Sequence, residues 1–261
     1  MSSDYETIRL ETDARGVARL VLNRPDKHNA LNAVMIGELT DATMQLAHDS
    51  DVRAVVLSAN GKSFCAGGDL GWMQEQFDAH SDERIKEATR VATMLQHLDK
   101  LPKLVIAIIE GPAYGGGVGL AAVCDIVLAT PETKFALTET RLGLIPATIA
   151  PFLIRRIGLT HARRFALNAN PFDADEAKSI GLVSEIHAPE KLEAALARQL
   201  DLALACAPGA IADAKQLFRK ITTGAVAQLE TIEALAKRWE SEEARQGIEA
   251  FFQHRRPPWA P

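Results

Sequence analysis

The sequence predicts an α/β protein in which a layered core is followed by a helical C-terminal region. Two short runs at 53–60 and 104–111 are apolar and rich in β-branched residues, which is typical of strands covered on both faces. A helical apolar pattern at 82–98 lies between them, as a crossover between parallel strands requires. From Pro189 onward, the apolar patterns have helical spacing. Strands that alternate with helices, followed by helices alone, indicate this fold class.

The remaining elements of the core follow from turn residues and apolar spacing. The segment 7–23 holds two apolar stretches around Gly16, which can take the positive φ of a hairpin turn. Residues 31–51 show apolar side chains at helical spacing, which predicts a helix. Further strands are predicted at 125–129 and 134–136.

The last third of the chain repeats apolar residues at i, i+3 and i+4 in three stretches, 190–207, 210–222 and 227–256. We therefore place a boundary near residue 190, so that residues 1–190 form the core and residues 191–261 form a helical region. A helical region of this length has to cover its own core or a neighbouring subunit.

The composition argues against several classes of partner. The formal net charge of −5 gives no electrostatic reason to expect nucleic acid or an anionic membrane. No apolar run is long enough to cross a bilayer. The three cysteines, Cys65, Cys124 and Cys206, lie far apart without CxxC spacing, so neither a disulfide framework nor a zinc site is expected. We expect a cytoplasmic protein in a reducing compartment, without a metal.

Two glycine-bearing loops each follow a predicted buried strand, and they contain Gly67–Gly68 and Gly115–Gly117. The dinucleotide-binding spacing GxGxxG fails, because from Gly115 the third glycine would fall at Leu120. Unpaired backbone amides at such a loop can receive an oxyanion, and glycine lets it approach closely. Two such amides from different loops would form an oxyanion hole. The alternative is that both loops are tight strand-to-helix turns.

Five segments are similar to the signatures of one protein family. In chain order they are NRPDKHNALN, KSFCAGGDL, IEGPAYGGGVGLAAVCDIVLA, FALTETRLGLIPA and DADEAKSIGLVSEI. They resemble the successive motifs of the enoyl-CoA hydratase/isomerase (crotonase) superfamily, in the family's order and over nearly the whole chain. The resemblance implies a crotonase-like core of repeated β-β-α turns in two nearly perpendicular sheets. It also implies a helical C-terminal trimerisation region, with the trimers commonly paired into hexamers.

The same resemblance implies an acyl-CoA thioester as the partner, so that CoA enters as part of the substrate and no separate cofactor is needed. The amides of Gly68 and Gly116 would form the oxyanion hole for the thioester oxygen. The implied contacts with CoA come from the early loop and from the first glycine loop: Arg24, Lys27, His28, Ala66, Asp69 and Leu70. Without the resemblance, Arg24 and Lys27 would indicate a solvated turn.

The two-base hydratases of this family use two glutamates, and this sequence retains one of them. Glu139 stands at the second position, in LTETRLG, whereas Gly119 stands at the first, two residues after the glycine triplet. A carboxyl group shielded from solvent can have its pKa raised toward neutrality, so Glu139 is expected to be the acid/base. A lone glutamate permits hydration, or the proton shuttle of a Δ3,Δ2-enoyl-CoA isomerase.

The wider sequence resembles bacterial methylglutaconyl-CoA hydratases of leucine catabolism and isohexenylglutaconyl-CoA hydratases of terpene breakdown, several of which also lack the first glutamate. The resemblance therefore favours hydration of 3-methylglutaconyl-CoA or isohexenylglutaconyl-CoA. Both acyl groups carry a distal carboxylate that needs a cation or donor, for which Arg141 and His28 are candidates. A non-catalytic acyl-CoA-binding protein is the alternative of another class.

Overall fold

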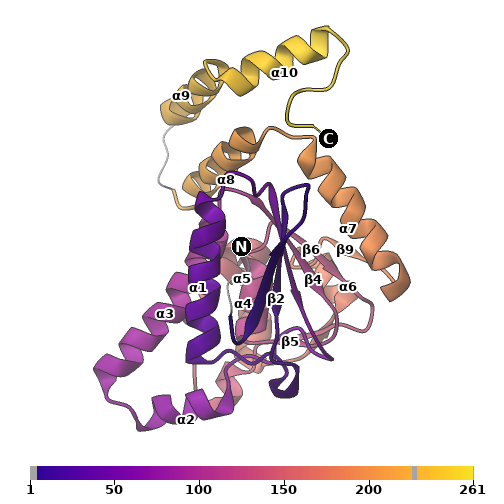
Figure 1. Ribbon diagram of the computed structural model, residues 1–261. Helices are drawn as coiled ribbons and strands as arrows, with labels where there is room; N and C mark the ends of the chain where they lie inside the picture. Colours follow the sequence, from indigo (N-terminus) through magenta and orange to yellow (C-terminus); the bar gives the residue numbers. More distant parts are fainter. Residues whose placement is uncertain (1–4, 225–227, 261) are drawn as a thin grey trace.

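The computed structural model describes residues 5–224 and 228–260, and it confirms the α/β fold class (Figure 1). A six-stranded sheet has the order β1-β2-β3-β4-β6-β9, and a three-stranded sheet has the order β5-β7-β8. The strands of the larger sheet are β1 (Ile8–Thr12), β2 (Val17–Leu22), β3 (Ala54–Ala59), β4 (Leu104–Ile109), β6 (Ile126–Ala129) and β9 (Glu185–Ile186). Those of the smaller sheet are β5 (Ala113–Tyr114), β7 (Lys134–Ala136) and β8 (Phe172–Asp173).

Strand pairing in the larger sheet agrees with the hairpin and the parallel strands predicted from the sequence. Its neighbours pair in parallel, except that β1 and β2 form an antiparallel hairpin. The hairpin turns at Gly16, which has a φ of 77°. A Cβ at Gly16 would lie 2.2 Å from the carbonyl oxygen of Asp51, so this turn requires glycine for its conformation and for its space. The hairpin and the four further strands predicted from the sequence are confirmed.

Helices cover both faces of the larger sheet, with α1 and α3 on one side and α7 on the other (Figure 1). One face shares a core cluster with four helices, which are α1 (Ala33–His48), α3 (Ser81–Lys100), α4 (Gly116–Ala122) and α5 (Ala150–Asn168). The other face packs against Leu192, Leu196 and Leu200 of α7 (Pro189–Leu204). Successive strand residues point to opposite faces, which is why these strands are apolar throughout.

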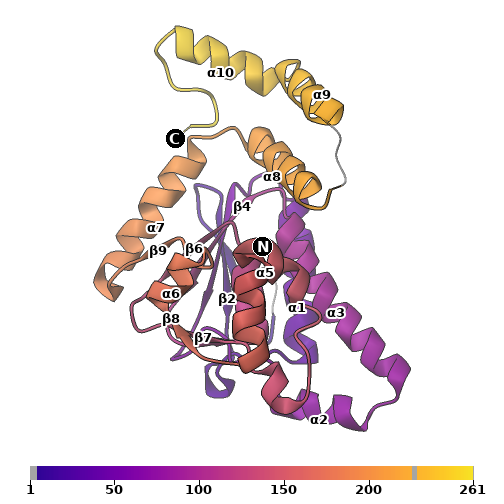
Figure 2. The same ribbon diagram turned by 180° about the vertical axis from the view of Figure 1, so that it is seen from behind.

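Three further helices follow α7, namely α8 (Pro208–Thr222), α9 (Gln228–Trp239) and α10 (Glu242–Phe252). Figures 1 and 2 show α9 and α10 beyond α8, on the side away from the sheet. The three predicted helical stretches are confirmed, the third as two helices, and residue 227 lies outside the described residues. Large apolar side chains remain exposed here, namely Phe218, Ile221, Ile232, Leu235, Trp239, Ile248, Phe251 and Phe252. The boundary near residue 190 and the role in trimer formation stay predictions.

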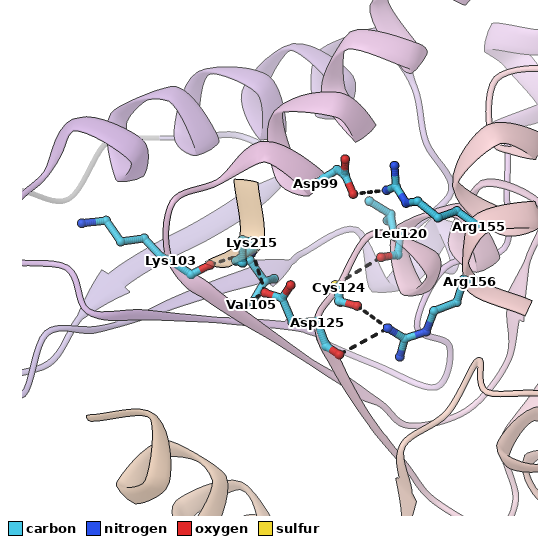
Figure 3. A network of polar contacts seen from close by, with 9 residues as sticks. All are labelled: Asp99, Lys103, Val105, Leu120, Cys124, Asp125, Arg155, Arg156 and Lys215. Carbon is cyan, nitrogen blue, oxygen red and sulfur yellow. Dashed lines mark hydrogen bonds and ion pairs between the residues drawn. The ribbon is translucent and has the colours of Figure 1, made fainter. Parts of the chain in front are cut away.

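An ion pair ties α8 to the core (Figure 3). Lys215 Nζ lies 2.6 Å from Asp125 Oδ2 and donates to the carbonyl oxygen of Lys103 at 2.8 Å. The same carboxylate oxygen accepts the Val105 amide of β4 at 2.8 Å. Arg156 of α5 donates to the carbonyl oxygen of Asp125 at 3.2 Å. Since α8 has no fully buried side chain, these polar contacts fix its place on the core.

Two short α-helices, α2 (Leu70–Asp78) and α6 (Ala174–Ser179), and two 3-10 helices, Pro25–Lys27 and Glu139–Leu142, complete the described part of the chain. No helix within residues 5–224 and 228–260 is long and apolar enough to cross a membrane. Over the same ranges, no group of three or more His, Cys, Asp or Glu side chains could hold a metal ion. The cysteines are free thiols, two buried and one exposed.

Candidate active site

The two glycine loops predicted from the sequence lie against each other. The Tyr114 amide donates to the carbonyl oxygen of Cys65 at 2.8 Å, and the Cys65 amide donates to the carbonyl oxygen of Pro112 at 3.2 Å. A Cβ at Gly67 would lie 3.3 Å from the Tyr114 carbonyl oxygen and 3.9 Å from Gly115 Cα. Glycine is therefore used here so that two backbones can approach closely, as the oxyanion-hole interpretation requires.

The amide of Gly68 points away from Leu31, the residue that pairs with Gly68. Gly68 forms an isolated parallel bridge with Leu31. In this bridge the Leu31 amide donates to the carbonyl oxygen of Gly67 at 2.7 Å, and the Asp69 amide donates to the carbonyl oxygen of Leu31 at 2.9 Å. Those two bonds use the groups on either side of Gly68, so the Gly68 N–H faces the opposite direction. No described residue accepts a hydrogen bond from it.

Gly116 supplies the second amide predicted for the oxyanion hole. It is the first residue of α4, where an amide has no acceptor inside the helix. The preceding Gly115 has a φ of 47°, a conformation that L side chains rarely adopt. A Cβ at Gly116 would lie 2.7 Å from Leu31 Cδ1. Leu31 thus contacts both predicted oxyanion loops, the first through its backbone and the second through its side chain, although it was not among the site residues predicted from the early motif.

Glu139 is the acid that the structure brings to these loops. It begins a 3-10 helix, Glu139–Leu142, and its Oε1 lies 3.2 Å from the position of a Cβ added at Gly115. Its Oε2 is buried, and no described group donates a hydrogen bond to it. Burial raises the pKa of the Glu139 carboxyl above its ordinary value of 4.5. A desolvated carboxyl with one unpaired oxygen, close to the two glycine loops, is suited to proton transfer.

The position of the missing glutamate is filled by apolar side chains. Gly119 is buried in α4, and a Cβ there would lie 2.5 Å from Ile149 Cγ2 and 3.6 Å from Leu95 Cδ1. Glu139 therefore packs at the start of α4 and Ile149 packs about one helical turn further along it. Sequence reasoning missed Ile149, because an apolar residue at the start of a helix carries no functional signal. With Ile149 in place, position 119 has no room for a carboxylate side chain.

Arg24 and Asp69, both predicted to contact CoA, are paired with each other. Arg24 Nη2 lies 3.0 Å from Asp69 Oδ2, and the two side chains are 16% and 17% exposed. Arg24 Nη1 also donates to the carbonyl oxygen of Ala30 at 2.6 Å. One N–H group on each terminal nitrogen of Arg24, and Oδ2 of Asp69, are therefore engaged inside the protein.

The other residues predicted to contact CoA lie at the surface near the first loop. Lys27 and His28 are exposed, and His28 Nδ1 lies 3.1 Å from Ser63 Oγ. The Ala66 amide donates to the carbonyl oxygen of His28 at 3.0 Å, so the early loop and the glycine loop are joined. Leu70 is 84% exposed. These four residues therefore form one accessible edge beside Gly68.

The segment after Glu139 carries exposed apolar side chains. Leu142, Leu144 and Ile145 are exposed large hydrophobic residues. Arg141 lies among them, is exposed, and forms no ion pair with any described residue. An apolar surface with one available cation is the kind of lining that an acyl group with a distal carboxylate requires.

Comparisons with known proteins place this chain in one family. A family model described as enoyl-CoA hydratase/isomerase matches residues 12–261. The enoyl-CoA hydratase ACTT6 of Alternaria alternata is 37% identical over 211 residues, which cover 78% of this chain and 67% of that protein. The crystal structure of an enoyl-CoA hydratase from Shewanella pealeana is 36% identical, with a TM-score of 0.94 over 98% of this chain and 97% of that one. Pseudomonas aeruginosa AtuE is 39% identical, with a TM-score of 0.94 over 98% of this chain and 100% of that one.

Proposed function

Since this chain belongs to the enoyl-CoA hydratase/isomerase family, we propose that it adds water to the double bond of an enoyl-CoA thioester. The observation that supports this most strongly is the buried, unpaired Oε2 of Glu139 beside the two glycine loops. CoA enters and leaves as part of the substrate and product, and the reaction draws on no separate cofactor.

In the proposed reaction, the thioester oxygen accepts hydrogen bonds from the amides of Gly68 and Gly116. Glu139 takes a proton from water as the hydroxyl oxygen bonds to Cβ of the acyl chain, and the electrons of the double bond move into an enolate. Charge then develops on the thioester oxygen, where two fixed amides stabilise it. Glu139 returns its proton to Cα, which restores the carboxylate and completes the addition of one water molecule.

The proposed substrates are 3-methylglutaconyl-CoA and isohexenylglutaconyl-CoA. The exposed apolar residues after Glu139 suit a branched acyl chain, and the unpaired Arg141 suits its distal carboxylate. His28, the other candidate, lies in the early loop, and its Nδ1 is 3.1 Å from Ser63 Oγ. Because His28 already has a partner there, Arg141 is favoured for this role. Lys27, His28, Ala66 and Leu70 remain the proposed edge for CoA.

A second candidate function is that of a Δ3,Δ2-enoyl-CoA isomerase, which Gly119 favours. Because Ile149 fills the space beside Gly119, Glu139 acts without a partner carboxylate, and one carboxylate suffices to move a proton between two carbons. A non-catalytic acyl-CoA-binding protein is the remaining alternative, and the buried, unpaired Oε2 of Glu139 argues against it.

The test is product analysis of three substrates in D₂O by mass spectrometry and NMR, namely 3-methylglutaconyl-CoA, isohexenylglutaconyl-CoA and a straight-chain enoyl-CoA. A gain of one water supports the hydratase, and preference for the glutaconyl substrates supports the proposed acyl group. A shifted double bond with deuterium incorporation and no added water would identify an isomerase. Binding of all three without any turnover would support the non-catalytic alternative.

We further propose a homotrimer or a homohexamer in the cytoplasm. The exposed apolar side chains of α8, α9 and α10 support self-association, and the free thiols are compatible with a reducing compartment. A light-scattering mass equal to one chain would contradict the proposed assembly.

A further inference from the structure

The early loop at residues 24–31 holds both predicted oxyanion loops in place. Leu31 exchanges backbone hydrogen bonds with Gly67 and Asp69, and its Cδ1 lies where a Cβ at Gly116 would clash. The position of Leu31 therefore sets how the Gly68 and Gly116 amides lie relative to each other. Whatever fixes this loop also fixes the oxyanion hole.

Arg24 fixes the loop from two directions. Its Nη1 donates to the carbonyl oxygen of Ala30, the residue before Leu31, at 2.6 Å. Its Nη2 contacts Asp69 Oδ2 at 3.0 Å across the gap to the first glycine loop. The guanidinium thus joins both strands of the Leu31–Gly68 bridge, and its rigid fork holds the two acceptors at a set distance.

Both carboxylate oxygens of Asp69 and its backbone amide form contacts inside the protein. Its Oδ1 accepts the amides of Gly71 at 2.9 Å and Trp72 at 3.3 Å, which caps α2, while its own amide donates to Leu31. Burial raises the pKa of the Asp69 carboxyl, but the hydrogen bonds from Trp72, Arg24 and Gly71 outweigh burial and leave the pKa below its ordinary value. The carboxylate is therefore charged at neutral pH and orients the residue next to Gly68.

We propose that Arg24 and Asp69 are a positioning pair that sets the direction of the Gly68 amide, and that neither side chain is a direct ligand of CoA. This inference rests on the proposed function, and it departs from the CoA contacts that the family resemblance implies for these two residues. A direct CoA ligand has to offer unused donors to the solvent, whereas Arg24 is 16% exposed and two of its nitrogens are engaged. Its role is exerted through Gly68, which binds the thioester oxygen.

The test compares kcat with KM for Arg24→Met and Asp69→Asn in the hydration of an enoyl-CoA. Asn at 69 still accepts the Gly71 and Trp72 amides and keeps the cap of α2, so this variant removes the charge opposite Arg24 and little else. A displaced oxyanion donor is expected to lower kcat about 10-fold or more, while KM and the affinity for free CoA change less than about twofold. Arg24→Lys is expected to restore part of kcat.

Two controls make the result decisive. Lys27→Met, in the same loop but exposed, is expected to raise KM with little change in kcat. The double variant Arg24→Met/Asp69→Asn is expected to lower kcat no further than the worse single variant, because both changes break one contact. A rise in KM at unchanged kcat for Arg24→Met would overturn the proposal, as would independent effects in the double variant.

The same variants separate this proposal from the proposed function. If the wild-type protein turns over no enoyl-CoA, the proposed function fails, and calorimetric titration with CoA then decides between the roles of Arg24. An unchanged CoA affinity in Arg24→Met supports a positioning role, and an affinity weakened more than about 10-fold shows direct contact.

Discussion

Gly119 is predicted to be a position where even one added methyl group destabilises the fold. Alanine in a helix interior is normally better than glycine by about 1 kcal/mol. Here, however, the new Cβ would lie 2.5 Å from Ile149 Cγ2 and 3.2 Å from Ile149 Cβ, well inside contact distance. Overpacking of a buried core typically costs about 1–3 kcal/mol. We therefore expect Gly119→Ala to lower the free energy of unfolding by about 1–3 kcal/mol, which is roughly 2–12 °C in Tm.

The assay is urea unfolding followed by circular dichroism, with a matched control and a rescue. Gly37 in α1 is the control, because a Cβ there meets only the flexible end of Arg90 at 3.3 Å, so Gly37→Ala is expected to be neutral or stabilising. Ile149→Ala removes Cγ2, which is the nearest contact, and in that background Gly119→Ala is expected to cost less than it does in the wild type. A Gly119→Ala protein as stable as wild type would refute the argument that Ile149 excludes a second carboxylate.

Four further outcomes are expected. Gly116→Ala places a Cβ 2.7 Å from Leu31 Cδ1, and the displaced amide is expected to lower kcat about 10²-fold in steady-state assays. Burial raises the pKa of Glu139, so kcat/KM is expected to fall as the pH drops through a value above 4.5. For the same reason Glu139→Gln should be more stable than wild type in urea at neutral pH, with the difference vanishing toward pH 4.5. Lys215→Met leaves Asp125 without its cation, and a loss of about 2 kcal/mol is expected by urea unfolding.

The outcomes for Gly116, for the pH profile and for Lys215 can each be contradicted by a simple result. Wild-type kcat in Gly116→Ala would remove that amide from the reaction. A pH profile flat down to 4.5 would show that the reacting group is not a buried carboxyl. Lys215→Met is compared with Lys220→Met, an exposed lysine of the same helix, and equal stabilities of the two variants would show that the ion pair does not anchor α8.

The strands were predictable where burial on both faces left a continuous apolar run, as in β3 and β4. The strands β5, β8 and β9 escaped prediction, because two residues each are too few to show a period. The helix α5 was missed because Gly158, with a φ of 75°, interrupts its helical geometry and its apolar pattern.

Candidate site residues could be predicted where glycine spacing or a family motif marks them, as at Gly68, Gly116 and Glu139, and their roles in the reaction stay predictions. The roles of Arg24, Asp69 and Ile149 could not be predicted, because each depends on a partner far away in the sequence. Arg24 meets Asp69 across two loops, and Ile149 fills the space beside Gly119 only after α5 has packed on α4. Long-range contacts of this kind leave no local periodicity or spacing to read.

The most direct test of the site is the rate of water addition to 3-methylglutaconyl-CoA by wild-type protein and by Glu139→Gln at neutral pH. Gln keeps the size of the side chain and removes its ability to take a proton. If Glu139 carries the proton, the variant should bind the acyl-CoA with unchanged affinity and hydrate it about 10²–10⁴-fold more slowly. Hydration by Glu139→Gln at a rate within a few-fold of wild type would show that another group moves the proton, and the proposed mechanism would be wrong.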